Sequence, residues 1–336
     1  MPHILIVAPN WIGDTLLAQP LFARLRERFP ALILDVLAPA WTAPVLARMP
    51  EVSEVIETPF MHGTLQLRER WRLGRSLRAR NYDTAIVLPN SFKSALVPFF
   101  ADIPLRAGYV GESRYGLLNV LHKLDAKRLS LMSERYVQLA GKPREAIHRP
   151  LPRTMLTVDQ ANLLITVGRL GLDRSRAVAV LCPGAEYGPA KRWPEAHFAA
   201  LAQQLAGRGY AVWLLGGPGD RAIGETIAAR SEGAATNCCG RTDLAAAIDL
   251  MSAADVVITN DSGLMHVAAA LKRPLVALYG SSSAEHTPPL ADQARLLKLD
   301  GLDCSPCYQR ECPLGHFRCM RELSPERVLA EIDELG

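Results

Sequence analysis

Short runs of aliphatic and β-branched residues recur along the chain and alternate with segments of helical length. Most runs are hydrophobic throughout, which predicts strands that are covered on both faces of a sheet. Such alternation is typical of parallel sheets with crossover helices, so the predicted fold class is α/β. The predicted strands are residues 4–7, 33–37, 52–56, 84–88, 177–182, 211–215, 256–259 and 275–279. The predicted helices include residues 16–28, 195–206, 243–253 and 264–271.

The alternation weakens between residues 144 and 176, where the segment 148–153 is rich in Pro and Arg. We interpret this stretch as the boundary between two similar α/β halves, and the length of 336 residues agrees with about two domains. Near the end of the chain, Ser324 suits a helix N-cap and Pro325 the first helical turn. This pair predicts a short C-terminal helix.

Composition excludes several classes of protein. Hydrophobic residues make up 49% and charged residues 21%, which is typical of a globular chain. The formal net charge of +4 is too small for a dedicated nucleic-acid binder. Every apolar run is shorter than the roughly 18 residues that would span a bilayer, and the N-terminus does not read as a signal peptide. We therefore expect a cytoplasmic protein, whose seven cysteines are reduced thiols or metal ligands.

Ligands of open parallel sheets bind beyond the carboxyl ends of the strands, so the loops after the strands are the candidate sites. The loop at residues 8–14 holds only Gly13 of a Gly-x-Gly-x-x-Gly fingerprint, which disfavours a dinucleotide-dependent dehydrogenase. Asp14 has two interpretations, as the N-cap of a helix that begins at Thr15 or as a general base. The two conflict, because a capping carboxylate has a lowered pKa and is a weaker base.

Two basic features lie in the first half. Ser91 and Lys93 stand at the start of a predicted helix, whose N-terminus would attract an anionic group. Upstream, six arginines accompany one acid between residues 65 and 80: Arg68, Arg70, Arg72, Arg75, Arg78 and Arg80. This segment is either a solvated helix face or a basic surface for anionic lipid headgroups or a phosphorylated substrate.

Three loops in the second half could hold a phosphorylated ligand. The loop at 183–194 is rich in small residues and carries Lys191 and Arg192, but it lacks the spacing of a P-loop. Asp220 follows the next strand, where an acid can bind ribose hydroxyls or cap a helix. The segment 260–266 opens a small-residue helix whose N-terminus favours a phosphate. Its candidate residues are Asp261, Ser262, Gly263 and His266.

A cysteine cluster lies near the C-terminus. Cys304 and Cys307 form a Cys-x-x-Cys pair, and Cys312 and Cys319 follow within sixteen residues of Cys304. Four thiolates at this spacing predict a tetrahedral structural site for zinc or iron, and the alternative is a loop of reduced thiols without metal.

Together the loops resemble the ADP-heptose:lipopolysaccharide heptosyltransferases. Five segments carry the resemblance: WIGD (11–14), PNSFKSA (89–95), PGAEYGPAKRWP (183–194), NDSGLMHVAAAL (260–271) and RPLVALYG (273–280). The resemblance implies a GT-B fold, with two Rossmann-like domains that face a central cleft and a C-terminal helix that crosses back to the first domain. The implied divisions are an acceptor-binding domain at 1–160, an ADP-heptose-binding domain at 161–322 and the final helix at 323–336.

The resemblance also implies roles for residues. Asp14 takes the place of the catalytic base, and Lys93 that of a basic residue that meets the anionic acceptor. We add Ser91, Arg68 and Arg72 as candidate acceptor-binding residues from the basic features of the first half. The implied donor-binding residues are Lys191, Asp220, Asp261, Ser262, Gly263 and His266.

The implied reaction is inverting transfer of L-glycero-D-manno-heptose from ADP-heptose to the 3-hydroxyl of the first heptose of heptosyl-Kdo2-lipid A. Asp14 would deprotonate the acceptor, while Lys191 and the helix-start amides near Gly263 would stabilise the charge that develops on ADP. No Asp-x-Asp pair is present, so no obligatory catalytic metal is expected. The lipid-linked acceptor implies peripheral contact with the inner face of the inner membrane, and no nucleic-acid partner is expected.

Three alternatives stay open at this point. A heptosyltransferase of type I or III would use a different acceptor. A sugar-nucleotide 2-epimerase of the same architecture would need no acceptor, and a non-catalytic nucleotide-sugar-binding module would turn nothing over.

Overall fold

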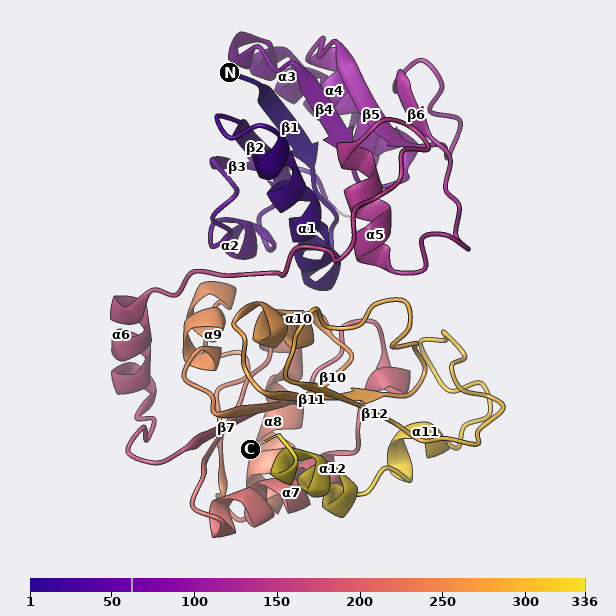
Figure 1. Ribbon diagram of the computed structural model, residues 1–336. Coiled ribbons are helices and arrows are strands. Elements are labelled where there is room, and N and C mark those ends of the chain that lie inside the picture. Colours follow the sequence, from indigo (N-terminus) through magenta and orange to yellow (C-terminus); the bar gives the residue numbers. More distant parts are fainter. Residues whose placement is uncertain (62, 336) are drawn as a thin grey trace. The chain divides into compact units, whose positions relative to one another are not determined.

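The computed structural model describes residues 1–61 and 63–335. The chain forms two compact units, Met1–Thr154 and Met155–Gly336, each built on its own sheet (Figure 1). The division falls six residues before the predicted boundary at 160. Each unit is an α/β layer structure, as the alternating pattern predicted.

The first unit contains a six-stranded parallel sheet in the order β3-β2-β1-β4-β5-β6. The strands are β1 (His3–Val7), β2 (Ile33–Pro39), β3 (Glu54–Thr58), β4 (Thr84–Val87), β5 (Leu105–Tyr109) and β6 (Val120–His122). The helices are α1 (Ile12–Arg28), α2 (Ala43–Leu46), α3 (Leu67–Leu77), α4 (Leu96–Phe100) and α5 (Met132–Val137), with short 3-10 turns η1 (Arg78–Arg80), η2 (Phe92–Ala95) and η3 (Gln138–Ala140).

The second unit contains another six-stranded parallel sheet, in the order β12-β11-β10-β7-β8-β9. Its strands are β7 (Val178–Cys182), β8 (Ala211–Leu214), β9 (Ala235–Asn237), β10 (Val256–Asn260), β11 (Leu275–Tyr279) and β12 (Ala294–Lys298). Its helices are α6 (Gln160–Leu170), α7 (Glu195–Gly207), α8 (Arg221–Arg230), α9 (Leu244–Met251), α10 (Gly263–Ala270), α11 (Arg318–Arg321) and α12 (Pro325–Asp333), with 3-10 turns η4 (Pro189–Lys191) and η5 (Pro218–Asp220).

Both sheets have the doubly wound strand order. In each unit the first strand pairs with the second on one side and with the fourth on the other, so the connections leave in opposite directions. This reversal creates a switch point, and ligands of such sheets bind there. The register brings the carboxyl ends of the central strands to the same edge of each sheet. Val7 of β1 pairs with Val87 of β4, and Thr259 of β10 pairs with Cys182 of β7. Loops 8–11 and 88–91 therefore emerge side by side, as do loops 183–188 and 261–262.

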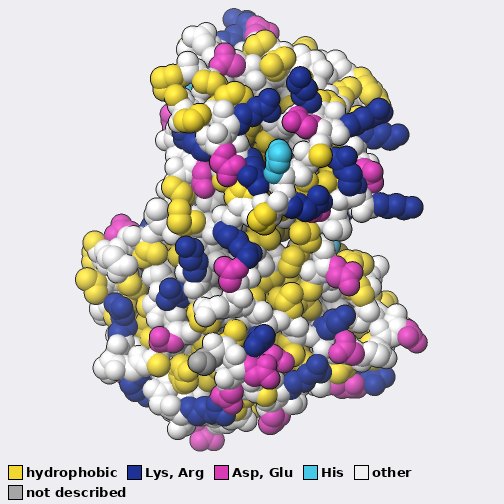
Figure 2. All heavy atoms as spheres, in the orientation of Figure 1, with side chains coloured by type: hydrophobic (Ala, Val, Ile, Leu, Met, Phe, Trp, Pro, Cys, Tyr) yellow, Lys and Arg dark blue, Asp and Glu magenta, His cyan; other side chains and the backbone are white. Residues whose placement is uncertain are grey.

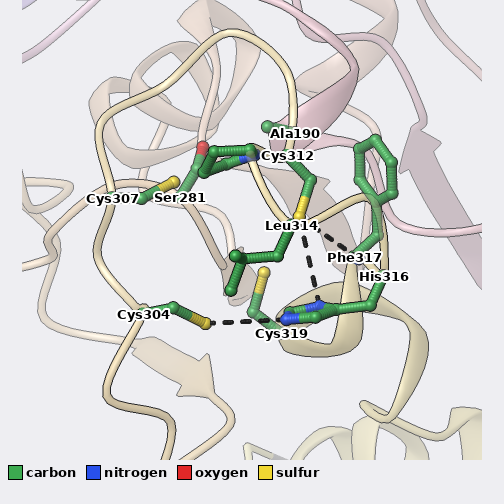
Figure 3. Close-up of a pocket in the computed structure, with 10 residues that line it drawn as sticks. Ala190, Ser281, Cys304, Cys307, Cys312, Leu314, His316, Phe317 and Cys319 are labelled. Carbon is green, nitrogen blue, oxygen red and sulfur yellow. Dashed lines mark hydrogen bonds between the residues drawn. The ribbon is translucent and has the colours of Figure 1, made fainter.

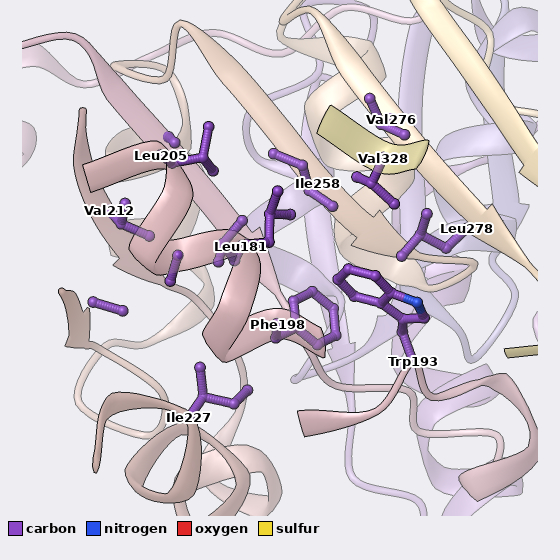
Figure 4. Packing of buried hydrophobic residues seen from close by; sticks show 14 of the residues in the cluster. Leu181, Trp193, Phe198, Leu205, Val212, Ile227, Ile258, Val276, Leu278 and Val328 are labelled. Carbon is purple, nitrogen blue, oxygen red and sulfur yellow. The ribbon is translucent and has the colours of Figure 1, made fainter. Parts of the chain in front are cut away.

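The C-terminal helix α12 begins as the sequence predicts. The hydroxyl of Ser324 accepts a hydrogen bond from the Arg327 backbone amide, and Pro325 occupies the first turn. The helix packs within the second unit, where Val328 and Ile332 join a core that also contains Trp193 and Phe198 (Figure 4). That this helix also crosses back onto the N-terminal domain stays a prediction. Its apolar face is used against its own unit, where burial of each aliphatic side chain contributes about 1.5–3 kcal/mol.

The sequence pattern did not predict four of the strands: β5, β6, β9 and β12. Three of them lie at sheet edges, and their sequences lack a continuous hydrophobic run; β12 for example carries Arg295 and Lys298. An edge strand has one neighbour and less cover, so polar residues are tolerated in it. The periodic pattern is strongest in the central strands, which carry the switch-point loops.

In residues 1–61 and 63–335 no helix is both long enough and apolar enough to cross a membrane. All seven cysteines lie in these described ranges, and all are free thiols.

Candidate active site

The switch point of the second unit holds a partly buried ion pair. Lys191 ends the short turn η4, and Asp261 directly follows β10. The Lys191 Nζ lies 2.5 Å from Oδ2 of Asp261, and the two side chains are only 18% and 5% exposed. The hydroxyl of Ser282 donates a second hydrogen bond to the same carboxylate oxygen. Removing ions from water is costly, and here the pairing and the added hydrogen bond offset that cost and fix the position of the carboxylate.

Asn260 fixes the loop that carries Lys191. Its side-chain amide donates to the carbonyl of Pro183 at 2.8 Å, and its side-chain oxygen accepts the backbone N–H of Trp193 at 3.0 Å. The Trp193 indole in turn donates to the carbonyl of Leu323 at 2.7 Å. Both ends of loop 183–193 are thereby tied to the end of β10 and to the core.

Ser262, Gly263 and His266 lie where α10 begins, next to the ion pair. Ser262 occupies the N-cap position with extended backbone, so the first backbone N–H groups of α10 start at this switch point. His266 is 5% exposed, and burial lowers its pKa to about 4, with opposing influences from Asp261 and Lys191. The imidazole is therefore neutral at pH 7 and offers hydrogen bonds rather than charge.

Asp220 sits at the carboxyl end of β8, against the loop after β7. Its Oδ2 accepts the backbone N–H of Gly217 at 2.9 Å, and burial raises the pKa of its carboxyl group. A Cβ added to Gly184 would lie 2.3 Å from an Asp220 oxygen, and one added to Gly216 would lie 2.8 Å from the Asp220 Cβ. The two glycines are thus required for the acid to reach the edge of the switch point.

In the first unit, Asp14 lies in the first turn of α1. The helix begins at Ile12 after Trp11, so the interpretation of Asp14 as the N-cap of a helix starting at Thr15 is wrong. A carboxylate in the first turn interacts favourably with the helix dipole. Burial, followed by the charge of Asp14, raises the pKa of Tyr136, which lies on α5 of the same unit. Asp14 is partly buried, and it stands at the carboxyl end of β1, where the switch-point rule predicts ligand chemistry.

Ser91 and Lys93 belong to the neighbouring loop after β4. Ser91 precedes η2, and Lys93 is half-buried within it. The loop backbone is held by Arg114, which is 1% exposed and donates to the carbonyl of Pro89 at 2.6 Å. Arg70 also donates to the carbonyl of Lys93, at 3.2 Å. The sequence pattern did not point to Arg114, and it indicated Arg70 only as a member of the basic segment, because nothing local distinguishes a buried arginine from a solvated one.

The arginine-rich segment divides into structural and exposed members. Arg70 is buried, while Arg78 pairs with Asp102 and Arg80 pairs with Glu54. The exposed face of α3 carries the remaining three, Arg68, Arg72 and Arg75, which fall within about 60° of arc at 100° per residue.

Hydrophobic side chains border this basic face of α3. Trp71 is 47% exposed and Leu67 is 50% exposed. Lys and Arg side chains mixed with hydrophobic ones also appear on the face of the first unit in Figure 2. Exposed bulky apolar groups beside cations are the composition that favours a surface for anionic lipid.

The four cysteines of the C-terminal cluster come together in the second unit. Cys304, Cys307, Cys312 and Cys319 line one small cavity, and His316 lines it with them (Figure 3). In the part of the chain that the structure describes, no three His, Cys, Asp or Glu side chains are arranged to hold a metal ion as they stand. Sequence spacing found the four thiols, but it missed the histidine, as it missed Asn260 and Ser282 of the ion-pair site.

Comparison with known proteins identifies the family. Residues 70–318 match glycosyltransferase family 9 (heptosyltransferase). The chain is 46% identical over 341 residues to lipopolysaccharide heptosyltransferase 2 of Escherichia coli K12, covering 99% of this chain and 98% of that protein. It is 43% identical to lipooligosaccharide heptosyltransferase 2 of Haemophilus influenzae, covering 99% of each. The solved structure of E. coli ADP-heptose lps heptosyltransferase II matches with a TM-score of 0.89 and 44% identity, covering 100% of this chain and 98% of that one.

These likenesses confirm the α/β fold class with two Rossmann-like domains of the GT-B type. Since both the family match and the relatives extend over most of the chain, it belongs to glycosyltransferase family 9, the heptosyltransferases.

Proposed function

We propose that this chain is an inverting glycosyltransferase that moves L-glycero-D-manno-heptose from ADP-heptose to the first heptose of heptosyl-Kdo2-lipid A. The observation that carries the proposal is the full-length likeness to heptosyltransferase 2 proteins, at 46% identity over 99% of the chain. The partly buried Lys191–Asp261 pair at the second switch point supports it, because a cation at this place suits a sugar diphosphate.

On the donor side, the second unit offers a fixed cation and the start of a helix. Lys191 and the backbone amides near Gly263 would stabilise the negative charge that grows on the leaving ADP. Asp261 and Asp220 would accept hydrogen bonds from sugar hydroxyls, and neutral His266 and Ser262 would complete the turn that surrounds the donor. These groups are already held by the protein, so little reorganisation opposes the reaction.

On the acceptor side, Asp14 would act as the general base. Inversion requires a base that takes the proton of the attacking hydroxyl on the sugar face opposite the leaving group. Ser91 and Lys93, at the neighbouring strand end, would contact the anionic inner core. Transfer by these groups calls for no metal, and any zinc or iron held by the C-terminal cysteines would be structural.

The exposed basic face of α3 would meet the membrane that carries the acceptor. Arg68, Arg72 and Arg75 would attract anionic headgroups, and Trp71 would contribute an interfacial anchor. The proposal therefore includes a cytoplasmic location, with peripheral contact at the inner face of the inner membrane.

An acceptor panel tests the proposal. ADP release from ADP-heptose is measured with Kdo2-lipid A and with its mono- and diheptosylated forms. We expect release only with the monoheptosylated acceptor. Release with Kdo2-lipid A or with the diheptosylated form would instead indicate a type I or type III enzyme. Release without any acceptor would indicate an epimerase or hydrolase, and binding of ADP-heptose without release a non-catalytic module.

A further inference from the structure

Five side chains with ligand chemistry surround one small cavity in the second unit, and the proposed transfer reaction uses none of them. Cys304, Cys307, Cys312, Cys319 and His316 line a space of about 20 Å³. About 10–15 Å³ suffices for one water molecule, so this space suits a single small ion. The segment 302–319 that carries them is largely irregular, and it holds four of the seven cysteines of the chain.

Two of the sulfur atoms lie beside the same imidazole, although in the described residues the thiols are not yet arranged around one point. The Sγ atoms of Cys304 and Cys312 lie 4.0 Å from Nε2 and Nδ1 of His316, respectively, and Cys319 lies beside them (Figure 3). A change of χ1 rotamer moves a cysteine sulfur by about 3 Å, so the thiols that line this cavity would bind a common ion after a change of rotamer. Tetrahedral zinc and iron sites with four thiolates need no further backbone ligand.

Backbone geometry favours a thiolate at Cys312. The chain turns at Gly315, whose φ is +69°, and the amide of Gly315 donates to the Cys312 carbonyl at 3.0 Å. This turn directs the amide of Phe317 to the Cys312 sulfur at 3.4 Å. An N–H bond to sulfur stabilises the charged thiolate, which is the form that binds metal.

Hydrogen bonds also define the role of His316. The backbone amide of Arg318 donates to Nδ1 of His316 at 3.0 Å, so in the neutral ring the proton is on Nε2. That N–H faces the sulfur of Cys304 and can support its negative charge without binding the ion itself. The four cysteines are then the ligand set, with the histidine as a hydrogen-bond donor to one of them.

The cysteine segment is hydrogen-bonded to both backbone segments that build the ion-pair site. The carbonyl of Arg310 accepts the amide of Ala190 at 3.0 Å, one residue before Lys191. The amide of Tyr308 donates to the carbonyl of Ser281 at 2.6 Å, one residue before Ser282. Ser305 also donates to the carbonyl of Gly280 at 2.7 Å.

At Gly188 the loop after β7 packs directly against the cysteine segment. A Cβ added to Gly188 would lie 2.4 Å from the Arg310 carbonyl oxygen, so the two backbones touch. The hydroxyl of Tyr187 donates to the Tyr308 carbonyl at 2.7 Å. Movement of the cysteine segment would therefore displace loop 187–191 and turn 280–282, which hold Lys191 and Asp261.

We propose that Cys304, Cys307, Cys312 and Cys319 bind one zinc or iron ion, and that this ion fixes the cysteine segment and thereby the donor-binding ion pair. Binding of metal and binding of donor are then coupled. Coupling between sites is reciprocal, so donor should strengthen metal retention by the same factor by which metal strengthens donor binding. The coupling rests on the proposed function, because it takes the Lys191–Asp261 site as the donor site; the metal site itself does not.

The metal site is tested by elemental analysis of the full chain purified without added metal. We expect one zinc or one iron ion per chain, absent from Cys307→Ser and Cys312→Ser and retained in Cys238→Ala, which alters a buried cysteine outside the cluster. His316→Gln should retain the ion but release it faster to a chelating dye. A stoichiometry near zero in the unmodified chain would overturn the site, whatever the variants do.

The coupling is tested on the unmodified chain, which avoids variants that fail to fold. ADP affinity is measured by calorimetry before and after removal of the metal by a chelator, and again after the metal is restored. We expect affinity to fall by about fivefold or more and to recover, and saturating ADP to slow metal release. Unchanged ADP affinity would overturn the coupling. Failure of both forms to bind ADP would count against the proposed function, while the metal stoichiometry would still decide the site.

Discussion

The two units have the same strand order but prepare their switch points differently. In the second unit the candidate site side chains themselves are largely removed from solvent: Lys191 is paired with buried Asp261, and buried His266 is neutral at pH 7. In the first unit the buried polar groups hold backbone, since Arg114 and Arg70 fix the loop that carries Ser91 and Lys93. One unit thus positions charges in advance, and the other positions a loop whose side chains are more exposed.

This difference fits the two substrates of the proposed reaction. A nucleotide diphosphate is small and highly charged, and fixed dipoles in a water-poor site stabilise its developing charge most effectively. A lipid-linked acceptor is large and is presented by a surface, so an accessible basic face is better suited to it. Four changes, each confined to one unit, test this difference, and their expected effects decrease from Asp14 to the basic face of α3.

The largest effect is expected for Asp14→Asn in the first unit. Removal of the base should lower kcat by about 10²–10⁴-fold, because the acceptor hydroxyl loses its proton acceptor. ADP affinity, measured by calorimetry, should stay unchanged, since the carboxylate belongs to the other unit. An active Asp14→Asn enzyme would show that the first unit only positions the acceptor.

Lys191→Ala should reduce kcat/KM by about 10²–10³-fold and weaken ADP binding as well. The loss combines the missing cation with a carboxylate of Asp261 that keeps Ser282 but loses its counter-ion. Steady-state kinetics with ADP calorimetry separates this result from that of Asp14→Asn, which changes rate alone. If Lys191→Ala left both quantities intact, preformed charge in the second unit would have no part in donor binding.

Acid should destabilise the second unit through His266. Its pKa of about 4 in the folded chain lies below the ordinary value of 6.5, so the unfolded chain takes up the proton first as pH falls. This contribution to stability is complete above pH 6.5 and is lost between about 6.5 and 4, on the order of 3 kcal/mol in all. Urea unfolding at pH 7 and pH 4.5 should show that the free energy of unfolding falls further in the unmodified chain than in His266→Gln. Equal losses would mean that the histidine is solvated.

The smallest effect is expected on the basic face of α3. Arg72→Gln should weaken binding to vesicles of anionic lipid by about fivefold, which corresponds to roughly 1 kcal/mol per charge, and salt should reduce the difference. Arg78→Gln serves as the matched control, because Arg78 is already paired with Asp102. Co-sedimentation with vesicles measures both. If both substitutions weakened vesicle binding equally, binding would depend on the net charge of the chain and not on the basic face of α3.

Part of the site could be read directly from the sequence. The residues after β1, β7 and β10 follow hydrophobic runs that can only be central strands, so the placement of Asp14, Lys191 and Asp261 at strand ends was predictable. The start of α1 at Ile12 was not, because the cap at Trp11 has no capping side chain of the usual kind. Arg114 and Asn260 were missed for a different reason: they bond to backbone groups of distant loops, which only folding brings close.

The sequence by itself determined the fold class, the two halves, the strand-end loops and the four clustered thiols, because periodicity and spacing are local properties of the chain. The tertiary structure decided which charges pair and which arginines are buried. It also placed α12 on its own unit and His316 among the cysteines. These outcomes depend on contacts between residues far apart in sequence and on burial, which sets both the strength of a charge pair and the pKa of a histidine.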